Sequence, residues 1–395
     1  MPSSPFVPSV PEWLTASHSK AHQRLVYSIL SKRERDRGMA RMASLADIRS
    51  SYALQQALKP LLEKNEHSKH YSVAIGGHPV NQWGNRYSNI EPYDRTRVVV
   101  GAPEGDCSVG CGRAAGQGRY LNASWVEELY GGKLWIATQA PLPVTAHAFL
   151  SVIAQPIAGY PSGSSLPEGS RVRTVVQLTL NQESGRTKAH SYFPCTVNQT
   201  TEVKPEPECK ATAFKVTLLE KTSFEDALCI QSKVSIVPAT ENPGKPIVFT
   251  HMMYTGWPDH GVPEDEDNVT LLKFLRLVDS VNKSSNGAVA DHDPPIMVNC
   301  SAGIGRTGSF IALSSLLRAY GLLGFSALRT PSGPSPAITA LHSSSPLGIL
   351  PKEIADDFVA QEIDNLREQR PGMVQRNEQI SLIYQILELA FLDRK

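Results

Sequence analysis

The sequence predicts an α+β fold, in which strands and helices share one core without alternating strictly along the chain. Short apolar or alternating segments, separated by turn residues, predict strands in the first and middle parts of the sequence. Longer segments, in which apolar residues recur every three or four positions, predict helices toward both ends. Because strands and helices do not alternate regularly, the pattern does not favour a doubly wound parallel sheet.

Six segments carry the strand signal, and a seventh strand is expected at the end of the loop-and-strand segment 85–100. The six lie at residues 121–125, 134–138, 172–180, 214–220, 227–237 and 247–254. Gly131 and Gly132 separate the first two, which predicts a hairpin. Residues 172–180 are apolar and β-branched enough for a buried strand. The last three segments alternate in polarity and predict an antiparallel meander.

Helical periodicity marks residues 18–64, the segment from Pro263 to Val278, and residues 354–368 and 377–392. The Arg-rich stretch 32–41 is expected to form an exposed basic helix face, with a docking surface as the alternative. Residues 1–17 are rich in Pro and Ser and are expected to be disordered. Residues 101–119 and 323–350 are rich in small residues or in Ser, Pro and Gly, and we interpret both as insertions.

Composition excludes several broad classes of protein. The 39 Lys and Arg residues nearly balance the 38 Asp and Glu residues, so no net charge indicates a nucleic acid or an acidic membrane as partner. Six scattered Cys residues do not form a disulfide framework. No apolar run has membrane-spanning length, and the first residues lack the pattern of a signal peptide. We therefore expect a soluble protein of a reducing compartment, in the cytoplasm, with the nucleus as an open alternative.

One loop, residues 298–308 (V-N-C-S-A-G-I-G-R-T-G), carries the chemistry. Apolar residues precede it and a helical pattern follows it, so it lies between a strand and a helix N-terminus. Such a loop can turn its backbone N–H groups toward an oxyanion, and the helix dipole adds positive potential. The same field favours a thiolate at Cys300, which makes it a candidate nucleophile, while Arg306 can bind two anion oxygens. The alternative is a buried structural Cys beside a Gly-rich turn.

A second loop supplies a candidate proton donor. Asp259 stands in the sequence Trp257-Pro-Asp-His-Gly, between a rigid Pro and a flexible Gly. A loop of this kind can close over a site and bring in a general acid. Taken alone, the same residues also suit an ordinary surface turn.

Together these motifs resemble the tyrosine-specific protein tyrosine phosphatases of the non-receptor type. The resemblance extends from about residue 85 to about residue 392. It rests on the Cys-x5-Arg loop, the Trp-Pro-Asp loop and five further segments in the family's order, at residues 85–87, 120–124, 136–142, 183–194 and 367–379. It implies a single large domain at residues 18–395, interrupted by the two insertions, with a highly twisted mixed β-sheet flanked by helices.

The resemblance also implies a role for each reacting group. Cys300 would form a phosphocysteine, Arg306 would bind the phosphoryl oxygens, and Asp259 would serve as general acid and then as general base. The remaining catalytic roles fall to Thr307, which would help the thiolate leave, and to Gln375 and Gln379, which would position the hydrolytic water. These steps need no metal and no cofactor.

The residues around these groups are implied to bind substrate or to support the site. Tyr87 would wall a deep pocket and Asn89 would contact the peptide backbone. The loop residues whose amides would surround the phosphoryl group are Ser301, Ala302, Gly303, Ile304 and Gly305. The supporting residues are Trp257, Glu183, Lys188, Asn299, Arg367 and Arg370. The expected partners are tyrosine-phosphorylated proteins, with no nucleic acid and no membrane span, and the expected state is a monomer.

The sequence departs from the family pattern at five positions without removing a reacting group. The family has His where this chain has Asn299, Lys at Gly84, a bulky aromatic at His260, Thr or a similar residue at Arg376, and Trp at Leu150. These departures bear on rate and on the pKa of the nucleophile more than on the type of reaction. Two alternatives stay open: a phosphotyrosine-binding pseudophosphatase with little turnover, and a dual-specificity or phosphoinositide phosphatase.

Overall fold

The fold is built around one mixed β-sheet of nine strands, seen in a computed structural model that describes residues 10–49, 66–101, 118–157, 166–207, 209–258, 261–283, 292–324 and 344–393. The strands, in their order across the sheet, are β1 (Arg97–Val100), β2 (Arg119–Glu127), β3 (Leu134–Thr138), β11 (Ile296–Asn299), β4 (Thr174–Gln177), β10 (Ile247–Tyr254), β9 (Cys229–Pro238), β8 (Phe214–Phe224) and β7 (Thr200–Val203). Two short strands, β5 (Gln182–Glu183) and β6 (Arg186–Thr187), form a separate hairpin.

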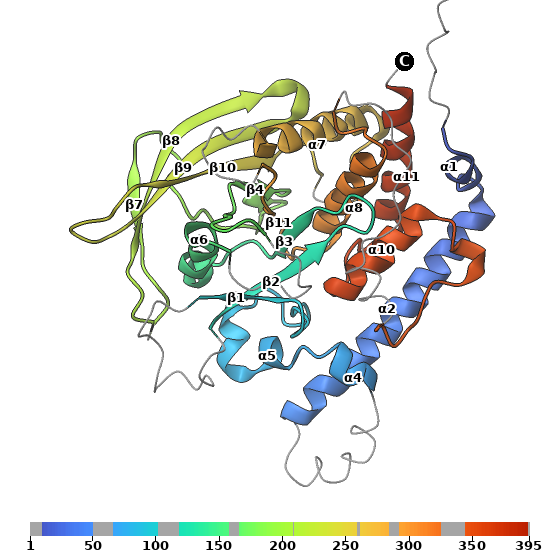
Figure 1. Cartoon of the computed structure of the whole chain (residues 1–395), viewed down its shortest axis with the longest axis horizontal. Coiled ribbons are helices and arrows are strands. Elements are labelled where there is room, and N and C mark those ends of the chain that lie inside the picture. Colours follow the sequence, from blue (N-terminus) through green and yellow to red (C-terminus); the bar gives the residue numbers. More distant parts are fainter. Residues whose placement is uncertain are drawn as a thin grey trace, which may run out of the picture.

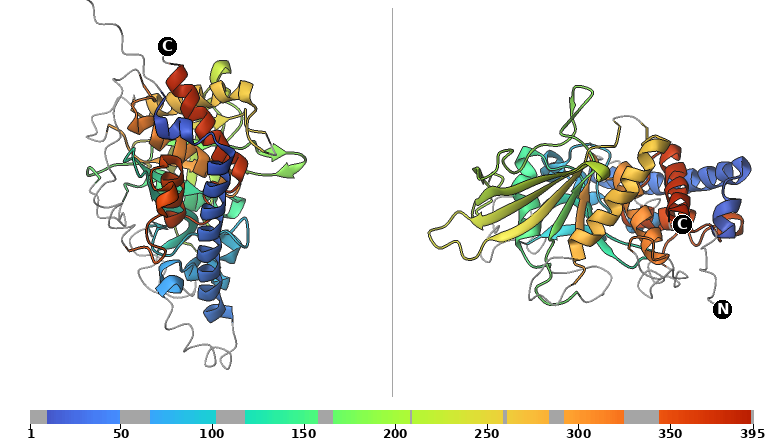
Figure 2. Two further views of the ribbon diagram at one scale, coloured as in Figure 1. Left: turned by 90° about the vertical axis from the view of Figure 1, so that its right-hand side faces the viewer. Right: turned by 90° about the horizontal axis from the view of Figure 1, so that it is seen from above.

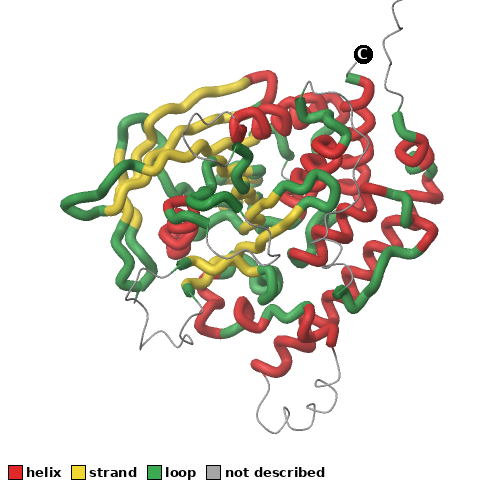
Figure 3. Tube along the Cα trace, viewed as in Figure 1, coloured by secondary structure: helices red, strands yellow, loops and turns green. Residues whose placement is uncertain are grey.

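Parallel pairing is confined to the centre of the sheet. There β11 pairs in parallel with β3 on one side and with β4 on the other, and β4 pairs in parallel with β10. The outer strands pair antiparallel, including the predicted hairpin of β2 with β3 and the meander of β8, β9 and β10. Strands gather on one side of the molecule and most helices on the other (Figure 3). The expected α+β class, with a twisted mixed sheet flanked by helices, is therefore confirmed.

The helices cover the two faces of the sheet unequally (Figure 1). One face carries α7 (Asn268–Lys283), α8 (Gly305–Ala319), α10 (Phe358–Gln369) and α11 (Asn377–Leu392), whereas α6 (Ala146–Ala154) covers the other. The longest helix, α2 (Lys20–Arg49), lies beside α10, and the short helices α4 (Glu66–His70) and α5 (Ala74–Gly77) follow it. The two further views in Figure 2 show the same pairing of α2 with the C-terminal helices.

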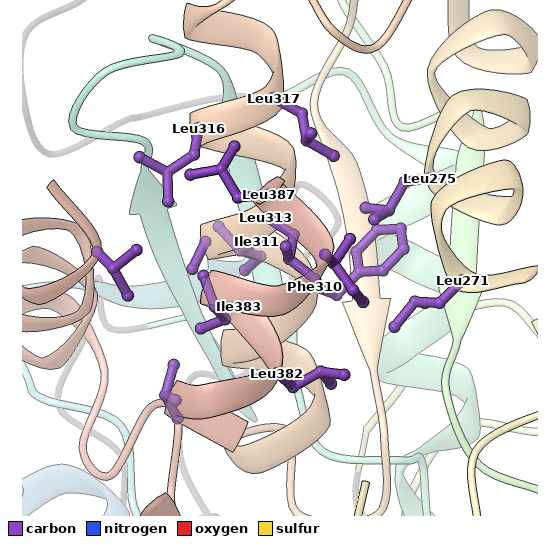
Figure 4. Packing of buried hydrophobic residues seen from close by; sticks show 14 of the residues in the cluster. Leu271, Leu275, Phe310, Ile311, Leu313, Leu316, Leu317, Leu382, Ile383 and Leu387 are labelled. Atoms are coloured by element: carbon purple, nitrogen blue, oxygen red, sulfur yellow. The ribbon is translucent and has the colours of Figure 1, made fainter. Parts of the chain in front are cut away.

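Alternation along the central strands supplies both halves of the core. Val298 and Val176 point toward α8, whereas their neighbours Met297 and Val175 belong to the cluster under α6. Helix α8 is buried on nearly all sides because it lies between α7 and α11 (Figure 4). The residues labelled there are Leu271 and Leu275 of α7, Phe310, Ile311, Leu313, Leu316 and Leu317 of α8, and Leu382, Ile383 and Leu387 of α11.

The structure corrects the expectation that residues 1–17 are disordered. Helix α1 (Glu12–Ala16) forms there, and Leu14 is fully buried. Trp13 donates a hydrogen bond from Nε1 to the Tyr320 hydroxyl at 2.9 Å and packs its ring on Phe358. The Pro- and Ser-rich composition therefore misled for this stretch, because two aromatic contacts from distant segments order it. Residues 1–9 lie outside the described part of the chain.

The structure also corrects the picture of residues 32–41 as an exposed basic face. This stretch lies within the continuous helix α2, and Arg33 and Arg37 are buried against carboxylates of α10. Most of the first predicted insertion, residues 102–117, lies outside the described residues, as do residues 325–343 of the second. Arg119, which we had assigned to the first insertion, begins β2. Within the described residues, none of the helices has both the length and the apolar character needed to cross a membrane.

Candidate active site

The nucleophile loop lies at the carboxyl end of the central strand. Strand β11 ends at Asn299 and helix α8 begins at Gly305, so the residues from Cys300 to Ile304 form the connection. Because β3 and β4 run parallel to β11 on either side, the segments that follow all three strands meet at this edge of the sheet.

The loop is held from outside through its carbonyl oxygens. The Ser301 carbonyl accepts from the Ala140 N–H at 3.0 Å, and the Ile304 carbonyl accepts from the Val374 N–H at 3.2 Å. Arg370 donates to the carbonyls of Gly303 at 2.7 Å and of the preceding residue at 3.1 Å. Among the described residues, the N–H groups of residues 301–303 donate no hydrogen bond to other groups of the chain. They remain available to an anion in the cavity.

Gly303 is required by the shape of this loop. Its φ of +72° lies in the left-handed region that other residues rarely adopt. A Cβ atom at this position would lie 2.1 Å from the carbonyl oxygen of Thr138. Only glycine lets the loop pass this close to the end of β3.

Cys300 is buried, with 6% of its surface exposed, yet its environment favours the thiolate. Burial alone would raise its pKa, but a hydrogen bond from the Thr307 hydroxyl, the charge of Arg306 and the backbone N–H groups of Thr307 and Ile304 together lower the pKa below its usual value. The Thr307 hydroxyl is itself buried and has no other hydrogen-bond partner in the described part of the chain, so its proton is free to point at the sulfur.

Cys229 shows that burial by itself has the opposite effect. It is as buried as Cys300, with 3% of its surface exposed, and burial raises the pKa of its thiol to about 12. The two cysteines therefore differ in the donors and charge that surround them, not in exposure. The loop, and not simple burial, makes Cys300 acidic.

Arg306 is fixed by a carboxylate from the β5–β6 hairpin. Its two terminal nitrogens lie 2.7 and 2.9 Å from the two oxygens of Glu183. Glu183 in turn accepts hydrogen bonds from the Thr179 hydroxyl at 2.6 Å and from the Leu180 N–H at 3.1 Å. Such a bidentate pair sets the plane of the guanidinium group, which lines the cavity.

Arg306 also reaches the loop that carries the predicted acid. It donates to the carbonyl oxygen of Pro258 at 2.8 Å. Trp257, which is buried, donates from Nε1 to the Gly261 carbonyl at 3.4 Å. Asp259 and His260 lie outside the described residues, so the role of Asp259 as the general acid stays a prediction.

Cys300, Arg306 and Glu183 line one cavity of about 330 Å³. Twelve of the residues predicted for the site line it: Tyr87, Asn89, Glu183, Lys188, Cys300, Ser301, Ala302, Ile304, Gly305, Arg306, Gln375 and Gln379. Six others do not line the cavity but adjoin its lining in the chain or through hydrogen bonds: Gly303, Asn299, Thr307, Trp257, Arg367 and Arg370. The structure thus brings together at one site every predicted residue that it describes.

Tyr87 forms one wall and is tied to the nucleophile loop. Its hydroxyl lies 2.8 Å from the Ser301 Oγ, and Ser301 donates to the Lys188 carbonyl at 2.8 Å. The ring keeps 37% of its surface exposed, as expected for a group at the rim of an open pocket. The wall is therefore held by the loop that it faces.

Gln375 and Gln379 also line the cavity. The Gln379 Oε1 accepts from the Arg376 N–H at 3.2 Å, and its side chain lies against Gly305, where a Cβ would be 2.9 Å from Nε2. Arg367 holds the segment before Gln375 by donating to the carbonyls of Met373 and Val374 at 2.8 and 2.7 Å.

Sequence reasoning missed several residues that complete the site. Thr179 orients Glu183, and Val374 ties the glutamine segment to the nucleophile loop with a φ of +53°. Ile90 and Arg376 line the cavity. No signal in the sequence marks a non-glycine residue for positive φ, although Arg376 had drawn notice as a departure from the family pattern.

Asn299, the departure beside the nucleophile, is fully buried. Its Nδ2 donates to the Cys300 carbonyl at 3.1 Å, whereas its Oδ1 has no hydrogen-bond partner within the described residues. Among those residues, no three His, Cys, Asp or Glu side chains gather as metal ligands would.

Comparison with known proteins agrees with this geometry. The sequence model of the family described as protein-tyrosine phosphatase matches residues 81–321, which is more than half of the chain. This chain therefore belongs to the protein-tyrosine phosphatase family. Its candidate active site holds Cys300, the amides of the loop that follows it and Arg306.

Three relatives illustrate the breadth of the similarity. The chain is 32% identical over 244 residues to tyrosine-protein phosphatase non-receptor type 14 of Homo sapiens, covering 60% of this chain and 17% of that protein. It is 30% identical over 261 residues to tyrosine-protein phosphatase Lar-like of Caenorhabditis elegans, covering 65% and 10%. It is 28% identical over 304 residues to tyrosine-protein phosphatase 2 of Schizosaccharomyces pombe, covering 77% and 33%. The chain therefore spans a third or less of each of these relatives.

Proposed function

We propose that this chain hydrolyses phosphotyrosine in proteins through a phosphocysteine intermediate. The observation that carries the proposal is the pairing of an acidified Cys300 with a fixed Arg306 at the base of one cavity. A phosphate monoester dianion needs charge stabilisation and in-line positioning more than covalent assistance from the protein. The thiolate, the loop amides and the guanidinium group supply these needs.

In the first step the Cys300 Sγ attacks phosphorus. The S–P bond forms as the bond from phosphorus to the tyrosine oxygen breaks, and Asp259 gives its proton to that oxygen. Arg306 and the amides of residues 301–305 bind the three other phosphoryl oxygens, on which charge gathers. The free tyrosine side chain then leaves the pocket.

In the second step water attacks the phosphocysteine. Gln375 and Gln379 hold the water, the Asp259 carboxylate takes its proton, and the S–P bond breaks. The pair of electrons returns to sulfur, where the Thr307 hydroxyl stabilises the thiolate. Inorganic phosphate is the second product.

The exposure of the lining residues favours phosphotyrosine over shorter phosphorylated residues. Tyr87, 37% exposed, and Cys300, 6% exposed, line the same cavity. The phenyl ring carries phosphorus farther from the peptide backbone than the side chains of phosphoserine or phosphothreonine do. The substrates would therefore be tyrosine-phosphorylated proteins, consistent with a role in signalling in the cytoplasm.

Turnover on matched peptides tests the proposal. Purified chain is assayed on three peptides that differ only in carrying phosphotyrosine, phosphoserine or phosphothreonine. We expect hydrolysis of the first alone, abolished by Cys300→Ser and retained in Cys195→Ser, which changes an exposed cysteine that does not line the cavity. Tight phosphotyrosine binding without phosphate release would indicate a pseudophosphatase. Equal release from all three peptides would indicate a dual-specificity enzyme.

A further inference from the structure

Helix α2 lies beside α10 (Figure 1), and buried ion pairs join the two helices. Arg33 donates from Nε and Nη2 to the two oxygens of Asp364 at 2.9 and 2.8 Å. One turn later, Arg37 lies 2.6 Å from Asp364 and 2.7 Å from Glu368. All four side chains are buried, so these contacts fix the two helices in one register.

Glu368 gathers further donors around the same junction. Its carboxylate accepts from the Tyr71 hydroxyl at 2.7 Å and lies 3.3 Å from the His70 ring. Burial alone would raise its pKa, but the hydrogen bond from His70 and the charge of Arg37 hold the pKa well below the usual range. Glu368 is therefore ionised at neutral pH and can pair with Arg37.

A third arginine, Arg367, connects helix α2 to the active site. Arg367, on α10, donates from Nη1 to the carbonyl of Leu30 in α2 at 2.9 Å. Its other nitrogens donate to the carbonyls of Met373 and Val374 at 2.8 and 2.7 Å. One planar guanidinium group thus joins α2 to the two residues that precede Gln375.

Val374 connects Arg367 to the nucleophile loop and to Gln375. Its φ of +53° is unfavourable for a β-branched residue, so the surrounding contacts must hold it. Arg367 binds its carbonyl, and its N–H donates to Ile304 in the nucleophile loop at 3.2 Å. The backbone direction of Gln375, the next residue, depends on both contacts.

We propose that α2 is a positioning element for the second half-reaction, acting through Arg33, Arg37 and Arg367 on Val374 and so on Gln375. This inference rests on the proposed function, because it concerns the water that attacks the phosphocysteine. Helix α2 precedes the segment 81–321 that matches the family, and no role in the reaction has been assigned to it above.

The two half-reactions depend on α2 to different degrees. In the first, Arg306 is held by Glu183, and the loop carbonyls are held by Ala140, Arg370 and Val374, so only the Ile304 carbonyl of this loop is held by a residue that Arg367 joins to α2. In the second, the new bond to phosphorus comes from a water whose place depends on Gln375. Loosening α2 should therefore slow the breaking of the S–P bond and leave its formation nearly unchanged.

Rapid-mixing kinetics with p-nitrophenyl phosphate separate the two steps. Release of p-nitrophenol reports formation of the phosphocysteine, and acid quenching measures the fraction of the full chain that is trapped in this form. Arg33→Gln removes the outer pair, and Lys32→Gln is the matched control, since Lys32 is exposed on the same helix. Arg367→Lys is a second variant that keeps the charge but cannot reach three carbonyls, in case Arg33→Gln does not fold.

We expect Arg33→Gln and Arg367→Lys to lower steady-state turnover roughly tenfold, because a small displacement of a positioned group is costly in rate. The trapped fraction should rise and the rate of the first step should stay within about twofold. A merely structural role would lower both steps together. Proportional loss in both steps, or no change in a folded variant, would overturn the inference. Failure of the unmodified chain to release p-nitrophenol would overturn the proposed function itself.

Discussion

Glu183 and Arg306 form a two-point contact, with both terminal nitrogens of the arginine on both oxygens of the carboxylate at 2.7 and 2.9 Å. The pair joins the β5–β6 hairpin to the first turn of α8. Thr179 and Leu180 also donate hydrogen bonds to Glu183, so the orientation of the carboxylate does not depend on Arg306 alone. An anion entering the cavity therefore meets a guanidinium group that is already oriented.

Substituting Glu183→Gln should impair phosphate binding. The amide keeps the shape but offers one acceptor in place of two charged oxygens, so Arg306 loses its fixed plane. We expect kcat/KM on phosphotyrosine peptides to fall about tenfold to a hundredfold, the range for loss of a hydrogen bond to a charged group. Gln182→Ala, on the exposed side of the same hairpin, is the control and should change little. An unaltered kcat/KM in Glu183→Gln would contradict the role assigned to the pair.

Substituting Asn299→His should make Cys300 more acidic. Asn299 already donates to the Cys300 carbonyl, but it is neutral and its Oδ1 is unsatisfied within the described chain. An imidazole can keep the donor and carry positive charge near the thiolate. Alkylation of Cys300 by iodoacetate rises with pH as the thiol ionises, so its midpoint should move to lower pH in the variant.

Thr307→Val should shift the pH midpoint of Cys300 alkylation in the opposite direction to Asn299→His. It removes the hydroxyl that lowers the pKa of Cys300, so its midpoint should move to higher pH. Coincident curves for the unmodified chain and Asn299→His, with a clear shift in Thr307→Val, would show that Asn299 is without effect.

Substituting Tyr87→Ala should weaken the preference for phosphotyrosine. The change removes the ring that walls the pocket and also the contact with Ser301. Tyr87→Phe removes only the contact and is the matched control. We expect the ratio of kcat/KM for phosphotyrosine over phosphothreonine peptides to fall in the Ala variant and to persist in the Phe variant. Equal ratios in all three proteins would show that Tyr87 does not determine the preference for phosphotyrosine.

Glu362 gives the protein a stability that depends on pH. It is fully buried under β2 and α8, and burial raises the pKa of its carboxyl to about 8, although the Ser315 hydroxyl at 2.5 Å partly offsets this. The folded chain therefore holds a proton that the unfolded chain releases between its ordinary pKa, 4.5, and about 8. Glu362 therefore contributes most to the free energy of unfolding below this pH range. The contribution is lost as pH rises through the range, by at most about 1.4 kcal/mol per pH unit.

Substituting Glu362→Gln should remove this dependence, because the amide is neutral at every pH. Urea unfolding at several pH values between 5 and 9 measures the free energy of unfolding of both proteins. The variant should gain stability relative to the unmodified chain as pH rises. Glu353→Gln, at an exposed position nearby, controls for the loss of a surface charge. A difference that is constant with pH would mean that Glu362 titrates normally.

The sequence predicted those elements whose patterns are local. Strands β3 and β10 and helix α11 have the predicted bounds, because each is an uninterrupted periodic run between turn residues. Strand β4 is shorter than the predicted 172–180, since only its central residues pair with β11 and β10. Helix α10 begins at Phe358, after a separate 3-10 turn at Lys352–Ile354 that the periodicity alone could not distinguish from it.

Contacts between distant segments could not be predicted in the same way. Arg33 and Arg37 look like a solvated basic face until Asp364 and Glu368 are placed opposite them. The site residues were predictable because a known motif fixes their spacing, and geometry then placed them around one cavity. The positive φ of Val374 and the orientation of Glu183 by Thr179 arise only once the chain is folded.

Hydrogen bonds from other segments to the carbonyls of the nucleophile loop also affect when Cys300 can be oxidised. Ala140, Arg370 and Val374 lie far from the loop in the sequence, so these hydrogen bonds require the folded chain. Until they do, Cys300 is an ordinary thiol, mostly protonated at neutral pH and slow to react with peroxide. Newly made or locally opened molecules should therefore react more slowly with an oxidant than the native chain does. Oxidative damage at this position would mark molecules that had already reached the native state.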